Sequence, residues 1–122
     1  MRSKTTSLNR GMRGSPRRGE IWWVRLDPTL GSEIRKTRPC IVLTSDVLNA
    51  RRRTVVVIPL SSTPTESPPL LIGLPSLGRP AVAVIDQIRA VSKERFDKRL
   101  GAAAPTELTA IEDGLRDVLE LG

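Results

Sequence analysis

The sequence predicts a mainly β domain that ends in a helix. Short apolar runs rich in β-branched residues are separated by turns rich in Pro, Gly and Ser between residues 20 and 90. Near the C-terminus the apolar residues change to helical spacing. The length of 122 residues suits one domain. Five short strands and a closing helix together predict a small, strongly bent sheet or a partly open barrel.

Two strands and a helical turn are expected in the first half of the domain. Residues 20–26 (EIWWVRL) predict a strand that is apolar on both faces, so this strand should be covered on both sides. Asp27 and Pro28 end it. Residues 40–44 (CIVLT) predict the second strand, with Arg38 at its entrance. Ser45 or Asp46 can then cap a short helical turn through Asn49.

Three further strands are expected before the helix. Residues 54–60 (TVVVIPL) predict the third strand, and residues 61–69 (SSTPTESPP) predict a loop. Residues 70–74 and 81–85 predict two more strands, joined by the PSLGRP turn. Residues 86–90 either continue the last of these strands or leave it, and residues 92–98 suit a turn of helix.

The final helix is expected from about Thr106, its predicted cap, to Leu121. One apolar face recurs at helical spacing along it and should close the core. The residues of that face are Leu108, Ile111, Leu115, Val118 and Leu119.

The net charge of +7 belongs mostly to the N-terminal tail. Residues 1–18 contain six cations and no acid, whereas the remainder contains 14 cations and 13 acids. Residues 1–16 are therefore expected to be a basic, disordered leader, and residues 17–122 the folded domain. A basic tail can strengthen binding to nucleic acid without specifying the sequence.

The composition excludes several classes of site. The chain has no histidine, which excludes Ser-His-Asp and Cys-His nucleophile systems and histidine metal ligands. In an enzyme, proton transfer and charge stabilisation would have to come from Arg, Lys, Glu, Asp, Ser and Thr, and we expect no cofactor. The single cysteine, Cys40, cannot form an internal disulfide, which suits a reducing cytoplasm. No apolar run approaches the roughly 20 residues that cross a bilayer, so no membrane association is expected.

The loop of residues 31–39 (GSEIRKTRP) concentrates charge between the first two strands. It contains one carboxylate, on Glu33, and three cations, on Arg35, Lys36 and Arg38. The proline after Arg38 favours an extended backbone there, which should hold the guanidinium at the mouth of a strand. A guanidinium held in this way matches phosphate oxygens well.

If the second and third strands are antiparallel neighbours, Arg38 lies close to Ser61 at the end of the third strand. Glu33 can then join them from the long loop. This set suits RNA cleavage by the neighbouring 2′-hydroxyl. Arg38 would stabilise negative charge on the phosphorane, and Ser61 would donate a hydrogen bond to a phosphate oxygen. Glu33 is the candidate base.

Each of these residues also has a purely structural alternative. Arg38 could form a surface ion pair with Glu33 or Asp27, Glu33 could simply be solvated, and Ser61 could only start a turn.

The order of segments resembles the MazF/PemK toxins of bacterial toxin–antitoxin modules. The segments are RRGEIWWVRLDPTLGSE, TRPCIVLTSDVLN, TVVVIPLSS and AVAVIDQIRAVSKERF, and the resemblance spans about residues 17–121. It implies a small SH3-like barrel, related to PemK and CcdB, that forms a homodimer. It also implies a metal-independent endoribonuclease that cuts single-stranded mRNA at short sequences, leaving a 2′,3′-cyclic phosphate and a 5′-hydroxyl. A cognate antitoxin would block its RNA groove.

The resemblance also implies roles for individual residues. The family's key arginine falls on Arg38, its key hydroxyl residue on Ser61 and its loop glutamate on Glu33. The glutamine of the DQIRA stretch falls on Gln87, which would help to hold RNA. Arg89 is a second RNA contact, with an exposed strand position as the alternative. Arg35 and Lys36 complete the expected RNA-binding set.

Two other functions are compatible with the sequence. One is a non-catalytic toxin that inhibits a protein target such as DNA gyrase. The other is a nucleic-acid-binding barrel in which the loop cations only grip phosphates. Trp22 and Trp23 are expected in the core or at a dimer contact, although an exposed Trp could stack a base.

Overall fold

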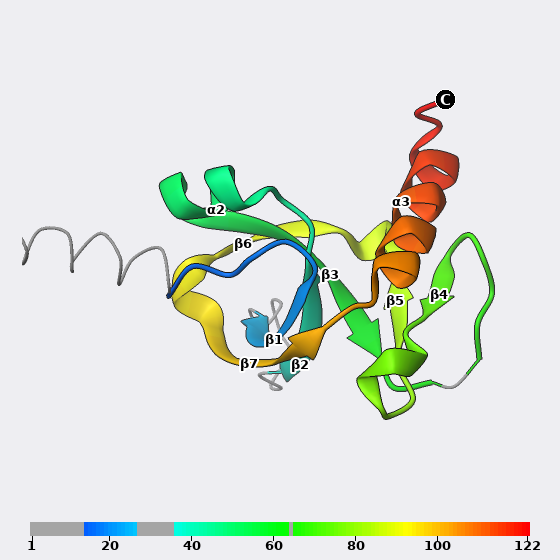
Figure 1. The fold of residues 1–122 in the computed structure, drawn as a ribbon, viewed down its shortest axis with the longest axis horizontal. Coiled ribbons are helices and arrows are strands. Elements are labelled where there is room, and N and C mark those ends of the chain that lie inside the picture. Colours follow the sequence, from blue (N-terminus) through cyan, green and yellow to red (C-terminus); the bar gives the residue numbers. More distant parts are fainter. Residues whose placement is uncertain (1–13, 27–35, 64) are drawn as a thin grey trace, which may run out of the picture.

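The computed structural model describes residues 14–26, 36–63 and 65–122 (Figure 1). Seven strands are present in this part of the chain: β1 (Glu20–Leu26), β2 (Lys36–Val42), β3 (Thr54–Ser61), β4 (Leu71–Gly73), β5 (Val82–Val84), β6 (Arg89–Ser92) and β7 (Phe96–Ala102). Two α-helices, α2 (Asp46–Arg51) and α3 (Pro105–Leu119), accompany them. Three short 3₁₀ turns lie between strands: η1 (Pro75–Leu77), η2 (Ile85–Gln87) and η3 (Lys93–Arg95).

Strand β3 organises the sheet, in which every strand pairing is antiparallel. One edge of β3 pairs with β2, and the other edge pairs with β6 near its start and with β5 near its end. The full order is β4-β5-β3-β2-β1-β7, with β6 also on β3. Figure 1 shows α3 standing beside β4 and β5, at the opposite side of the molecule from α2. The predicted class, a mainly β barrel-like sheet with a C-terminal helix, is confirmed.

The two faces of the sheet build two separate cores. On one face, Val24, Cys40, Val42, Val55, Val57 and Val91 are buried together, with Trp22 and Phe96 packed against them. On the other face, α3 covers a larger core that includes Ile41, Ile58, Leu60, Ile85 and Ile111. The alternation of side chains along β2 and β3 sends neighbouring residues into different cores. Apolar residues on both faces of the central strands therefore serve the fold directly.

The first strand, the short helix and the third strand follow the prediction closely. β1 covers the predicted residues 20–26, and β3 extends the predicted strand by one residue, Ser61. Ser45 caps α2, where its side chain accepts a hydrogen bond from the Leu48 N–H.

Several element bounds differ from the prediction. β2 runs from 36 to 42 rather than from 40 to 44, because pairing with β1 extends back to Lys36 opposite Leu26. The helical turn expected over 92–98 is present as η3 at Lys93–Arg95, but a seventh strand, β7, begins at Phe96 because it pairs along β1. Of the two alternatives given for residues 86–90, the second holds, because the chain leaves β5 through η2 before β6 begins. The two strands expected at 70–74 and 81–85 are shorter, at three residues each.

The start of α3 also differs from the prediction. The N-cap is Ala104, with Pro105 in the first turn, so Thr106 lies inside the helix. The Glu107 carboxylate replaces a capping hydroxyl, because it accepts hydrogen bonds from the Ala104 N–H at 2.8 Å and from the N–H and hydroxyl of Ser76 at 2.8 and 2.5 Å. Of the predicted apolar face, Ile111 is fully buried, whereas Leu119 is 49% exposed near the helix end.

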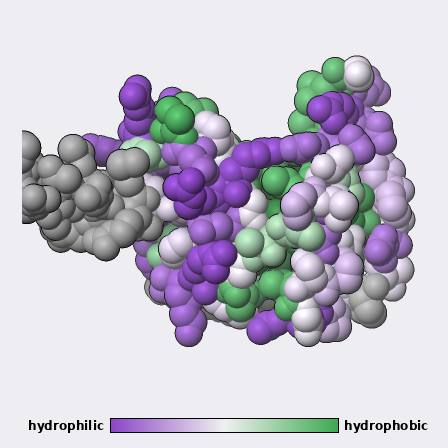
Figure 2. Space-filling view, viewed as in Figure 1, coloured by the Kyte–Doolittle hydropathy of each residue, from purple (hydrophilic) through white to green (hydrophobic). Residues whose placement is uncertain are grey.

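On the face that Figure 2 shows, apolar areas lie over α2 and the outer end of α3, and smaller ones lie among hydrophilic residues in the middle and lower part of the molecule. The large exposed hydrophobic residues of these two helices and the tail are Val47, Leu48, Leu119 and Leu121. Neither described helix has the length and apolar character that a bilayer crossing needs.

Candidate functional site at the ends of β2 and β3

Arg38 and Ser61 occupy matching positions on adjacent strands. The β2–β3 ladder pairs Val42 with Val57 and Cys40 with Pro59. Two further steps along the same register bring Arg38 opposite Ser61. The paired positions end at Cys40 and Pro59, so Arg38 and Ser61 lie two positions beyond the last pair. Strands β2 and β3 are the antiparallel neighbours that the prediction assumed.

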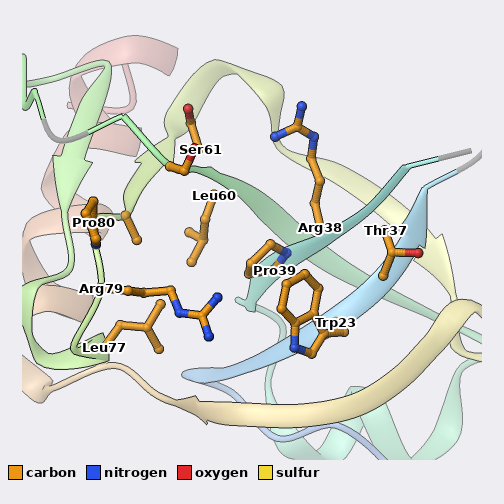
Figure 3. A pocket seen from close by; sticks show the side chains of 11 residues that line it. Trp23, Thr37, Arg38, Pro39, Leu60, Ser61, Leu77, Arg79 and Pro80 are labelled. Atoms are coloured by element: carbon orange, nitrogen blue, oxygen red, sulfur yellow. The ribbon is translucent and has the colours of Figure 1, made fainter. Parts of the chain in front are cut away.

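A pocket of about 450 Å³ opens where these strand ends separate (Figure 3). Four segments line it: β1 at Trp23, the start of β2, the end of β3 with the residue after it, and the stretch from the end of η1 to the residue before β5. Its lining residues are Trp23, Thr37, Arg38, Pro39, Leu60, Ser61, Ser62, Leu77, Arg79, Pro80 and Ala81. The volume lies within the roughly 300–1,000 Å³ typical of ligand pockets.

The side chains of this pocket divide between the two faces of β2. Figure 3 shows the Arg38 side chain extending away from the Trp23 ring, whereas Pro39 lies beside that ring. The pairing of Trp23 with Pro39, and of Val24 with Arg38, gives the same division. Arg38 is half-buried and forms no ion pair within the described residues. Its guanidinium is therefore available to an anionic ligand at the pocket rim.

A second arginine, Arg79, closes the far side of the pocket. It is exposed on the turn after Gly78, whose φ of 81° is the left-handed conformation that favours glycine. Its guanidinium carbon lies 5.8 Å from the centre of the Trp23 ring, within the range of a cation–π contact. Arg79 was not predicted as part of a site, and Trp23 was expected in the core or at a dimer contact, with base stacking as the alternative. The only sequence signal was an arginine inside the Pro- and Gly-rich PSLGRP turn, which does not show what lies opposite.

The hydroxyl of Ser61 has one weak partner within the described chain. Its oxygen accepts a hydrogen bond from the Thr63 N–H at 3.4 Å. Since that contact uses the oxygen only as an acceptor, the hydroxyl proton remains able to donate to a ligand.

A third arginine belongs to the same face as Arg38. Arg89 on β6 pairs with Val57, which pairs with Val42, so it shares the face of Cys40 and Arg38. Burial raises the pKa of the Cys40 thiol to about 12, while the charges of Arg89 and then Arg38 oppose that rise. Both guanidinium groups therefore act on this buried position, and Cys40 stays an uncharged core residue.

The other predicted site residues are distributed as follows. Gln87 is exposed in η2, between β5 and β6. Lys36 is the first residue of β2. Glu33 and Arg35 lie outside the described residues. In the described part of the chain, no three Asp, Glu, Cys or His side chains gather in a way that would hold a metal ion. These site residues form a cationic rim beside a pocket that Trp23 lines, which suits an anionic ligand with a flat apolar part.

Comparison with known proteins agrees with the fold and extends it. Residues 17–119 match the family described as the PemK-like, MazF-like toxin of type II toxin-antitoxin systems. The chain belongs to the PemK/MazF toxin family.

Curated relatives of this PemK/MazF chain are endoribonucleases. It is 33% identical to endoribonuclease MazF9 of Mycobacterium tuberculosis over 114 residues, which cover 86% of this chain and 97% of the relative. It is 32% identical to the endoribonuclease toxin MazF of Escherichia coli K12, over 80% of this chain and 87% of that protein. It is 34% identical to endoribonuclease PemK of Escherichia coli, over 84% and 80% respectively.

Solved structures of PemK/MazF proteins share the architecture. The MazF structure from Deinococcus radiodurans aligns with a TM-score of 0.74 at 25% identity, covering 87% of this chain and 97% of that one. A mycobacterial endoribonuclease in complex with its cognate antitoxin aligns with a TM-score of 0.72 at 23% identity, covering 88% and 98%. At that identity the second likeness shows the fold alone.

Proposed function

We propose that this toxin is a sequence-specific endoribonuclease that cleaves single-stranded mRNA through the 2′-hydroxyl, without a metal ion. The observation that carries the proposal is the convergence of Arg38 and Ser61 on one pocket, in a chain whose curated relatives are endoribonucleases. The substrate contains its own nucleophile, so the protein must only position it, move protons and stabilise charge.

Arg38 stabilises the phosphorane in this mechanism. As the 2′-oxygen bonds to phosphorus, negative charge builds up on the non-bridging oxygens, and the bond from phosphorus to the 5′-oxygen then breaks. A preorganised cation aimed at developing charge is usually the largest catalytic contribution. The position of Arg38 on a strand, rather than on a loop tip, supports this role because the strand restrains the guanidinium.

Ser61 and Glu33 have complementary roles. The Ser61 hydroxyl donates a hydrogen bond to a phosphate oxygen, which helps to align the 2′-oxygen with the leaving group. The 2′-hydroxyl proton passes to a base, for which Glu33 is the candidate, and the departing 5′-oxygen takes up a proton to become the 5′-hydroxyl product. The second product carries a 2′,3′-cyclic phosphate.

The surrounding cations hold the RNA strand. Arg89 lies on the same face as Arg38, and Gln87 precedes it in an exposed turn. Lys36 and Arg35 would extend this contact along the chain. We also propose a homodimer that acts in the cytoplasm and is inhibited by a cognate antitoxin, in keeping with the antitoxin complexes known for proteins of this fold.

Mapping the 5′ ends of a long RNA after digestion tests the proposal. The purified protein should cut at a short recurring sequence, leave 5′-hydroxyl ends, and cut equally well in EDTA. Loss of cleavage in EDTA that magnesium restores would contradict the metal-free mechanism. RNA that stays intact during growth arrest would instead indicate inhibition of a protein target.

A further inference from the structure

We propose that Trp23 and Arg79 form a base-stacking subsite beside the Arg38–Ser61 rim. The ligand is one nucleobase of a single-stranded RNA chain, and the inference rests on the proposed function for the identity of that chain. Trp23 supplies the aromatic surface and Arg79 supplies a planar guanidinium on the opposite side. Neither residue has a part in the mechanism above.

The chemistry of the pocket matches one base. Its walls are apolar at Pro39, Leu60, Leu77 and Pro80, and Figure 3 shows the Arg79 side chain reaching across the space toward Trp23. Single-stranded RNA is recognised largely by stacking unpaired bases on aromatic rings and guanidinium planes. A pocket that offers both kinds of surface suits a flat aromatic ligand better than a sugar or a phosphate.

The distance between Arg79 and Trp23 is slightly shorter than a base stacked between them needs. The guanidinium carbon of Arg79 lies 5.8 Å from the Trp23 ring centre. A base between two stacking partners needs about 7 Å, twice the ~3.4 Å spacing of stacked bases in a strand. Arg79 must therefore withdraw by about 1 Å, which is easy for an exposed side chain on a turn. In the absence of RNA, Arg79 covers the face of the Trp23 ring on which the base would stack.

The location connects this subsite to the reacting phosphate. Arg38 and Ser61 border the same pocket from the ends of β2 and β3. A phosphate held at this rim places a neighbouring nucleotide at the pocket mouth. Trp23 of β1 and Arg38 of β2 lie on opposite faces of the sheet. The base and the phosphate would therefore be held on opposite faces of the sheet, at the start of β2.

Tryptophan fluorescence tests stacking independently of cleavage. Trp22→Phe leaves Trp23 as the only tryptophan. A random-sequence single-stranded DNA 12-mer, which has no 2′-hydroxyl and cannot be cut by the proposed mechanism, should quench Trp23 emission saturably. An abasic oligomer of the same length should bind through its phosphates without quenching. Binding that is detected by anisotropy but leaves Trp23 emission unchanged would overturn the proposal, and so would an absence of binding.

Two variants of the pocket provide a second test, which does not depend on the folding of Trp22→Phe. Trp23→Leu keeps an apolar wall and should weaken binding of the DNA 12-mer by about 5- to 150-fold, the effect of ~1–3 kcal/mol of stacking. Arg79→Ala should also weaken binding of the base-bearing oligomer while sparing the abasic one. If Arg79→Ala weakened binding of both oligomers equally, Arg79 would be a phosphate contact and the subsite would be overturned.

Failure of the proposed function can be distinguished from failure of the subsite. If the wild-type protein binds the DNA 12-mer with quenching of Trp23 but cuts no RNA, the proposed function fails and the subsite stands.

Discussion

Two sets of arginines in this molecule differ in their partners. Arg17, Arg18 and Arg99 each form an ion pair within the described chain, with Asp46, Glu112 and Glu20 respectively. The arginines on or near the pocket, which are Arg38, Arg79 and Arg89, form no ion pair with any described residue.

The paired arginines stabilise the fold, and we propose that the three arginines at the pocket contact an anionic ligand instead. Arg18 joins the N-terminal segment to the Leu43 carbonyl and to α3, and Arg99 joins β7 to β1. Among the described residues these three cations have no acidic partner, and an anionic ligand would balance their charge. Substitutions in the two groups should therefore affect different properties.

The largest expected effect comes from Arg38→Ala. Removing the charge that faces the phosphorane should lower the RNA cleavage rate by about 100- to 1,000-fold. Thermal stability should stay the same or rise slightly, because a repulsive charge is removed. Single-turnover cleavage and a melting curve measure the two properties.

Arg99→Ala is the matched control for Arg38→Ala. It removes a half-exposed ion pair with Glu20, which should cost at most about 1 kcal/mol of stability and leave cleavage unchanged. Cleavage by Arg38→Ala at the wild-type rate would remove the distinction between the two groups of arginines.

Ser61→Ala should reduce cleavage by a smaller factor. A hydrogen bond to a charged group is worth about 1.5–3 kcal/mol, which corresponds to roughly 10- to 100-fold in rate. Ser61→Thr retains the hydroxyl and should cleave near the wild-type rate in the same assay. Equal activity of the alanine and threonine variants would show that the hydroxyl takes no part.

Much of this site could be predicted from the sequence, because its residues lie at strand ends. The strand patterns around Arg38 and Ser61 place both residues at neighbouring ends once antiparallel order is assumed, and the register agrees. The β7 strand was missed because FDKRLGA has little apolar alternation and owes its conformation to pairing with β1. The Trp23–Arg79 contact was missed because 56 positions separate the two residues, and only the return of the chain through η1 and β5 brings them together.

Glu107→Gln should change stability and leave the site unaffected. Glu107 is 8% exposed, and its carboxylate accepts hydrogen bonds from Ser76 and Ala104. In Glu107→Gln the side-chain NH₂ would face one of these hydrogen-bond donors, and that hydrogen bond would be lost. We expect a loss of about 1–3 kcal/mol, with a melting temperature lower by about 4–8 °C per kcal/mol. RNA cleavage at 25 °C should match the wild type. Reduced cleavage by a fully folded variant would indicate that α3 communicates with the pocket.

The same carboxylate predicts a pH dependence. Burial acts to raise the pKa of Glu107, but the hydrogen bonds from Ser76 and Ala104 outweigh it and hold the pKa below the ordinary value of 4.5. A lowered pKa in the folded state means that the stabilisation is complete above about pH 4.5 and is lost as the pH falls through the folded-state value. The stability difference between wild type and Glu107→Gln, measured by urea unfolding, should therefore shrink as the pH falls below 4.5. A difference that grows in acid would reverse the sign of this assignment.

The smallest expected effect belongs to Arg89→Ala. Arg89 is exposed and lies two strands away from Arg38, so it should contribute attraction to the RNA backbone rather than charge stabilisation at the reacting phosphate. Binding of a single-stranded oligomer should weaken modestly, and the slope of log K against log salt should become shallower by about 0.7, the value of one phosphate contact on a single strand. The catalytic rate at saturating RNA should not change. The Arg99→Ala variant, which loses a paired cation, should keep the wild-type salt slope. If both variants changed the slope equally, net charge alone would govern RNA binding, and the paired and unpaired arginines would be equivalent in this respect.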